Sequence, residues 1–140
     1  IRVGYTRWDI WGVLQQWVWV FSQWSTGARK THKGDIIRLS SKKFPFEYRE
    51  LVDQLQRAAL SICLNIAEGS AKQSDKDFRR YLLNSLGSTN EVIAGLDIAA
   101  TVMPVLSTET KTLMDTYAAI GRQLGGLCKK LKESSSISRL

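Results

Sequence analysis

A chain of 140 residues with 44% hydrophobic residues has the size of one domain and enough apolar side chains for a core, which excludes a disordered protein. The formal net charge of +7 favours contact with polyanions, although it fits a role in solubility equally well. One histidine and two cysteines do not make a metal site, and two prolines leave room for long helices.

The positive charge is concentrated towards the two ends of the chain. Residues 1–45 carry eight Lys and Arg against two acidic residues, residues 46–106 carry six against eight, and residues 107–140 carry six against three. In many proteins that bind nucleic acid, basic clusters of this kind contact the phosphates of the RNA or DNA. The residues that we predict to contact nucleic acid are Arg29, Lys30, Lys33, Lys42, Lys43, Lys129, Lys130 and Lys132.

The amino-terminal segment, residues 1–24, contains all five tryptophans of the chain. Gln15 and Gln16 interrupt its apolar run, which is shorter than the roughly 20 apolar residues of a membrane span, so we expect no membrane helix. Arg2 and Arg7 precede the run, as basic residues do in a signal peptide, which is therefore an alternative, although no clear cleavage site follows. We expect either an extra helix against the bundle or a neighbouring subunit, or an extension with little role. Stacking of the tryptophans on RNA is a weaker alternative.

We place the helical domain at residues 25–133. Its first helix is expected to end near Leu39. Gly27 and Gly34 weaken a helix before that point, but Ile36 and Ile37 restore an apolar pattern. Phe44 and Pro45 then mark a turn.

The second helix is expected from about Phe46 to Ala67, with Gly69 as its left-handed carboxyl-terminal cap. Its apolar stripe, at steps of three and four residues, is Leu51, Leu55, Ala58, Ile62 and Ile66. A polar stripe runs beside it and contains Gln54, Arg57, Ser61, Asn65 and Glu68.

The third helix is expected to begin at Ser74, which caps it together with Asp77, and to stop before Pro104. Its apolar face includes Phe78, Leu82, Leu86, Val92, Leu96 and Met103. A second polar stripe contains Asp77, Arg80, Asn84, Ser88 and Glu91. Both polar stripes are interpreted either as solvated faces or as the lining of a subunit interface.

The turn between these helices suggests specific side-chain contacts. In an antiparallel hairpin that turns near Lys72, Glu68 lies level with Arg79 and Arg80, and we predict a hydrogen bond from one of them. By the same register, Arg57 faces the region of Ser88 and Glu91. The residues to which we assign a structural role are Asn65, Glu68, Gly69, Arg57, Arg80, Ser88 and Glu91.

The fourth helix is expected to start near Ser107 or Thr108, and residues 134–140 are expected to fray. Its heptad-like seam is Leu113, Tyr117, Ile120, Leu124, Leu127 and Leu131. The pair Gly125 and Gly126 weakens the helix but allows another backbone to approach. Long helices with short turns predict an all-α fold, an antiparallel up-down-up-down four-helix bundle.

The run Asn65–Ser70, in this helical context, resembles a known family: the bacterial four-helix-bundle proteins encoded in intervening sequences of 23S rRNA genes. The resemblance covers residues 36–132 and rests on residues 37–39, 42–45, 51–59, 61–62, 65–70, 76–81 and 86–88 and on Glu91. The tryptophans from Trp8 to Trp19, the glycines Gly27 and Gly34 and the basic cluster at residues 29–33 depart from the family pattern, whereas Trp24 could take the place of the tryptophan near the start of the family's first helix.

The resemblance implies a small bundle without enzymatic activity that forms homo-oligomers, often pentamers. A related branch, the accessory proteins of retroelements, implies association with RNA or DNA and with a reverse transcriptase or other nucleic-acid enzyme. The sequence itself shows no nucleophile–base pair, phosphate loop or dinucleotide motif, so we expect no enzyme and no cofactor. Reduced cysteines favour the cytoplasm. The alternative is a protein-interaction scaffold with no nucleic-acid role.

Overall fold

The computed structural model describes residue 39 and residues 44–137, and these residues are helical apart from short connections. The elements are η1 (Phe46–Tyr48), α3 (Arg49–Ser70), α4 (Asp75–Val102), η2 (Pro104–Leu106) and α5 (Ser107–Ile137). No strand occurs within this described part of the chain, which confirms the expected all-α class.

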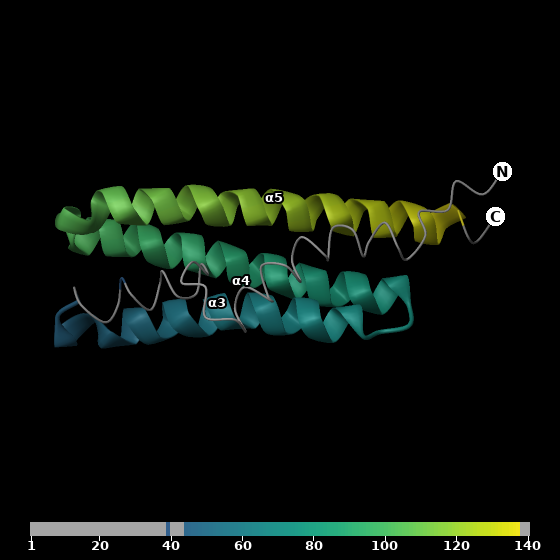
Figure 1. Cartoon of the computed structure of the whole chain (residues 1–140), viewed down its shortest axis with the longest axis horizontal. Coiled ribbons are helices and arrows are strands. Elements are labelled where there is room, and N and C mark those ends of the chain that lie inside the picture. Colours follow the sequence, from purple (N-terminus) through teal and green to yellow (C-terminus); the bar gives the residue numbers. More distant parts are fainter. Residues whose placement is uncertain (1–38, 40–43, 138–140) are drawn as a thin grey trace, which may run out of the picture.

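The three long helices run antiparallel, with α4 between α3 and α5 (Figure 1). The turn after α3 and the last turns of α5 therefore lie at one end of the molecule, and η1 and η2 lie at the other. This arrangement allows each helix to bury its apolar stripe against a neighbour.

The core confirms the predicted stripes. Leu82 and Leu96 on α4 are completely buried, and Leu55 on α3 and Leu124 on α5 are nearly so. The seam of α5 is buried as expected, with Leu127 partly buried. Fully buried aliphatic side chains of this size each contribute about 1.5–3 kcal/mol to folding.

The boundaries of α4 follow from its first and last residues. Ser74 has extended backbone angles, and its Oγ accepts a hydrogen bond of 3.1 Å from the Asp77 amide. The same hydroxyl donates to Asp77 Oδ2 over 2.7 Å, so the predicted capping pair is confirmed. Pro104, which has no amide hydrogen, lies just beyond the end of α4 at Val102.

The structure corrects the expected end of the preceding helix. α3 begins after a 3-10 turn, at Arg49, and continues through Gly69 to Ser70, so the assignment of Gly69 as a left-handed cap is wrong. The cap position is Ala71, in right-handed helical geometry. Gly69 is buried, and a Cβ there would lie 2.7 Å from the Tyr81 Cβ. The glycine is needed because α4 passes very close to α3 at this point.

The structure shows three of the four expected helices. The expected first helix falls on residues outside the described part, except for Leu39. Leu39 is helical, only 7% exposed, and part of the hydrophobic core. The tryptophan-rich residues 1–24 also lie outside the described residues, as do Arg29, Lys30, Lys33, Lys42 and Lys43. At the other end of the chain, α5 continues past residue 133 to Ile137.

Within the described part of the chain, none of the helices combines the length and the hydropathy that crossing a bilayer requires.

Candidate nucleic-acid interface

The last turns of α5 carry the three predicted phosphate-contacting lysines that the structure describes. Lys129, Lys130 and Lys132 are all exposed on this helix. Cys128, just before the lysines, and Leu131, between Lys130 and Lys132, are buried in the core, so the heptad pattern orients the helix and leaves the lysines outside.

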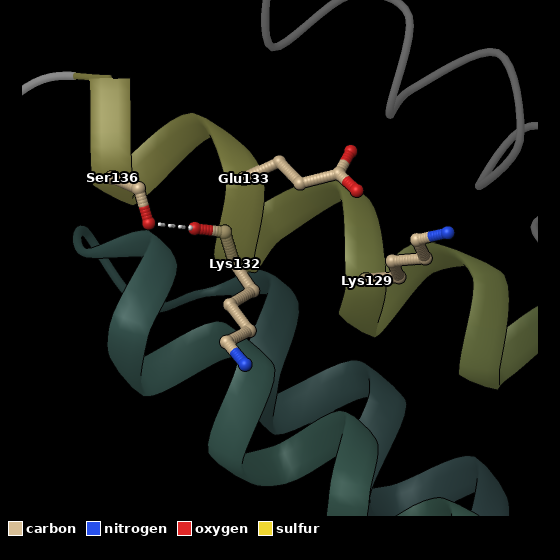
Figure 2. A pocket seen from close by; sticks show the side chains of 4 residues that line it. All are labelled: Lys129, Lys132, Glu133 and Ser136. Atoms are coloured by element: carbon tan, nitrogen blue, oxygen red, sulfur yellow. Dashed lines mark hydrogen bonds between the residues drawn. The ribbon is translucent and has the colours of Figure 1, made fainter.

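A surface hollow of about 550 Å³ lies beside these lysines, lined by Lys129, Lys132, Glu133 and Ser136. Figure 2 shows Lys129 and Glu133 extending to the same side of α5, whereas Lys132 extends in another direction. Ser136 Oγ donates a hydrogen bond of 3.0 Å to the Lys132 carbonyl. The hollow is therefore a shallow depression of the surface, bordered by two lysines and one carboxylate.

Two hydrogen bonds join the end of α5 to the start of α4. Arg79 Nε donates to the Cys128 carbonyl oxygen over 3.3 Å. Nearly two turns further along α5, Ser134 Oγ donates to Asp75 Oδ2 over 2.9 Å. These contacts hold the basic first turns of α4 beside the lysines of α5, which are about 50 residues later in the sequence.

We define the basic end as residues 68–80 together with residues 128–137. It contains seven Lys and Arg against four Asp and Glu. The opposite end, residues 44–56 and 97–115, contains two Lys and Arg against six Asp and Glu. The three helices thus carry an excess of positive charge at one end and of negative charge at the other.

Three of the four carboxylates of the basic end are engaged in local hydrogen bonds. Asp75 accepts from Ser134, and Asp77 accepts from Ser74. Glu68 Oε1 accepts from the Tyr81 hydroxyl over 2.9 Å and from Lys72 Nζ over 3.3 Å. The Tyr81 hydrogen bond, followed by Lys72, holds the pKa of the Glu68 carboxyl below its ordinary value, and the Glu68 carboxylate raises the pKa of Lys72.

The predicted partner of Glu68 was therefore wrong, although its predicted role in joining the two helices is confirmed. The cross-helix bond comes from Tyr81 rather than from Arg79 or Arg80. Arg79 instead points to α5, and Arg80 lies 4.0 Å from Asp77 on its own helix. Two cations lie over the Tyr81 ring: Lys72 Nζ is 5.1 Å and Arg80 Cζ is 5.3 Å from the ring centroid.

Asn65 and Ser88 belong to a polar seam between α3 and α4. Asn65 Nδ2 donates to both the carbonyl and the Oγ of Ser61, and Ser88 Oγ donates to the same Ser61 Oγ over 2.9 Å. Below them, the buried Ser85 Oγ donates to the Ile62 carbonyl over 3.0 Å. Ser85 and Ser88 join α4 to α3 and keep the two helices close and in register, whereas both hydrogen bonds of Asn65 stay within α3.

The rest of the two polar stripes is solvent-exposed. Arg57 donates to Gln54 Oε1 on its own helix over 3.0 Å, and Glu91 and Asn84 are exposed on α4. The prediction that Arg57 faces the region of Ser88 and Glu91 gains no hydrogen bond in support, because Arg57 bonds Gln54 and Ser88 bonds Ser61. Of the stripe residues, Ser88 is buried, and Ser61 and Asn65 beside it are half-buried.

Other chemistry has little support among the described residues. No group of three or more His, Cys, Asp or Glu side chains within residue 39 and residues 44–137 is placed to hold a metal ion. Cys63 is half-buried and Cys128 is buried, and the two are not joined in a disulfide. Burial raises the pKa of the Cys128 thiol, and the positive charge of Arg79 acts in the opposite direction.

Two comparisons bear on the identity of the chain. The model of the 23S rRNA-intervening sequence protein family matches residues 29–126. The chain is also 33% identical, over 95 residues, to a Bacillus subtilis protein described as uncharacterized protein YdbA. That match covers 68% of this chain but only 33% of YdbA, so the chain spans about a third of the length of this relative.

Proposed function

Since the chain belongs to the family of 23S rRNA-intervening sequence proteins, we propose that it is a small, non-enzymatic helical bundle that associates with the backbone of RNA or DNA. One observation carries the proposal: the basic end brings Lys129, Lys130 and Lys132 beside the basic first turns of α4. These groups are far apart in the sequence and come together only in the fold.

Phosphate contact is the chemistry that this surface fits. A cluster of lysines presents mobile ammonium groups, and each contact with a phosphate releases condensed counterions from the nucleic acid. Asp75 accepts a hydrogen bond from the neutral Ser134 hydroxyl, whereas Glu68 and Asp77 each lie beside a cation of their own segment, Lys72 and Arg80. We therefore expect phosphate contact to depend mainly on the lysines of α5. No base-reading groups are needed, so we expect affinity with little sequence preference.

We also propose that the full domain is a four-helix bundle whose first helix ends near Leu39. The burial of Leu39 in the core supports this, because a segment that comes before α3 must pack against the three described helices to place it there. We further propose that the bundle forms a homo-oligomer and that its partners include a nucleic-acid enzyme such as a reverse transcriptase. Several copies would repeat the basic end and strengthen binding to a long polyanion.

The test is a titration of fluorescently labelled RNA and DNA, single- and double-stranded, followed by anisotropy at several salt concentrations. We expect saturable binding at low salt that weakens steeply as salt increases. Absence of binding at low salt to every one of these probes would contradict the proposal.

The alternative is a scaffold for other proteins without a nucleic-acid role. The exposed stretches of the polar stripes, such as Arg57 and Glu91, favour it. The same titration distinguishes the two functions, because a scaffold would show no binding, or binding that does not depend on salt.

A further inference from the structure

The connection between α4 and α5 is apolar along its whole length. Residues 102–106 are Val, Met, Pro, Val and Leu, whereas the connection between α3 and α4, residues 71–74, contains Lys72, Gln73 and Ser74. Short connections between helices usually carry polar residues, because they face water. We call residues 102–106 the apolar corner.

Only part of the apolar corner is used for folding. Leu106 is buried and Met103 packs against the core, but Val102, Pro104 and Val105 are exposed. Val105 is 80% exposed, the largest value among the large hydrophobic residues that the structure describes. The three outward side chains lie outside the core of the described residues, so folding does not explain why they are apolar.

The exposed apolar surface continues from the corner onto α4. Ile98, one turn before Val102, is also exposed. The exposed Asp97 and Thr101 border this pair. The surface is therefore an apolar patch with a carboxylate at its edge.

Backbone hydrogen bonds hold the apolar corner in one conformation. The Met103 amide donates to the Ala99 carbonyl, and the Leu106 amide donates to the Met103 carbonyl, each over 2.9 Å. Side chains on a fixed backbone lose little conformational entropy when a partner covers them. The corner is thus shaped for a partner before the partner arrives.

The surroundings of the apolar corner are acidic. The acidic end, residues 44–56 and 97–115, contains two Lys and Arg against six Asp and Glu. It also holds Phe46, which is 78% exposed and has the Arg49 guanidinium 4.5 Å from its ring centroid. Apolar side chains combined with negative charge are complementary to a basic, partly apolar segment. The same charge repels RNA, DNA and anionic lipid.

We propose that the apolar corner is a docking site for a partner protein, which presents a segment where Lys or Arg alternate with large apolar side chains. The apolar side chains of this segment cover Val102 and Val105, and its cations lie beside Asp97 and the other carboxylates of the acidic end. Proteins that act on nucleic acid carry basic segments. The inference rests on the proposed protein partner and gives it a surface, which lies opposite the basic end and leaves that end open to nucleic acid.

The binding of a labelled peptide to the whole chain tests the docking site. The probe is a fluorescein-labelled amphipathic peptide of lysine and leucine, followed by anisotropy, and its control has glutamate in place of lysine. We expect saturable binding of the lysine peptide and no binding of the glutamate peptide.

A matched pair of variants locates the binding. The double variant Val102→Ser, Val105→Ser should weaken binding of the lysine peptide by about tenfold. Leu64→Ser, at an exposed leucine of α3 outside the acidic end, should leave it unchanged. All three positions are exposed, so circular dichroism should show the same helix content in each variant.

Equal peptide binding by the wild type and the double variant would overturn the proposal, as would equal binding of the glutamate peptide. A lower mass of the double variant in light scattering would also overturn it, because a second copy would then occupy the corner. The double variant should still bind labelled nucleic acid like the wild type, since the basic end lies at the other end of the helices. Loss of nucleic-acid binding by the wild type, with peptide binding intact, would contradict the nucleic-acid function and support the docking site.

Discussion

Gly69 and Tyr81 mark the closest approach of α3 and α4: a Cβ on Gly69 would lie 2.7 Å from the Cβ of Tyr81 and 3.0 Å from Phe78 Cδ2. Both helices are continuous here, so neither backbone can move aside without disturbing its neighbours. The short turn that follows, and the Glu68–Tyr81 hydrogen bond next to it, depend on this approach.

Gly69→Ala is therefore expected to destabilise the protein by about 1–3 kcal/mol, although alanine is the better helix former. Urea unfolding followed by circular dichroism measures this change. Gly126→Ala is the control, because it lies in an exposed part of α5 with open space and should gain up to about 1 kcal/mol. Equal stabilisation by both substitutions would mean that α3 and α4 do not approach as described.

A substitution at Leu39 tests whether the chain before Phe44 contributes to the hydrophobic core. Because it is only 7% exposed and packed in the hydrophobic core, Leu39→Ala should cost about 2–5 kcal/mol of unfolding free energy. Leu64→Ala, at a leucine that is 57% exposed on α3, should cost less than about 0.5 kcal/mol. Similar small losses for both would remove the support for a fourth helix.

The Glu68 carboxyl should titrate below the ordinary range of glutamate, as measured by NMR. Its folded pKa is lower than its unfolded pKa, so its contribution to stability is complete above the unfolded value and is lost as pH falls through the folded value. Tyr81→Phe and Lys72→Gln should each raise this pKa, because each removes a hydrogen bond that the Glu68 carboxylate accepts. An unchanged pKa in Tyr81→Phe would show that the tyrosine hydroxyl is not a partner of Glu68.

Cys128 should react slowly with thiol reagents in the folded protein, because burial raises its pKa and restricts access. In a Cys63→Ser background, alkylation at pH 8 is expected to be much slower in the native protein than in urea. Because the unfolded thiol loses its proton first, stability should also fall as pH rises above the ordinary thiol pKa. Equal alkylation rates in the two states would place Cys128 at the surface.

Much of this architecture follows from periodicity in the sequence. The spacing of Leu82 and Leu96 predicts the buried face of α4, and Ser74 with Pro104 predicts its limits, because these signals are local. The function of Gly69 could not be read in the same way. A glycine near the end of a helix usually indicates a cap, and only the position of α4 reveals that the missing side chain is needed for packing.

The candidate site shows the same limit. The sequence indicates that Lys129, Lys130 and Lys132 are exposed and basic, but it gives no sign that Arg79 and Asp75 lie beside them. Those contacts join segments about 50 residues apart and depend on the register of α4 against α5. Tyr81 was missed as the partner of Glu68 because register alone favoured the neighbouring arginines, whose side chains extend elsewhere.

The salt dependence of nucleic-acid binding by the variant Lys129→Gln, Lys130→Gln, Lys132→Gln tests the central proposal most directly. With duplex DNA, the slope of log affinity against log salt should become shallower by about one for each lysine that contacts a phosphate. Lys111→Gln, at the acidic end, should leave the slope unchanged. A triple variant with the affinity and slope of the wild type would show that the basic end does not contact nucleic acid.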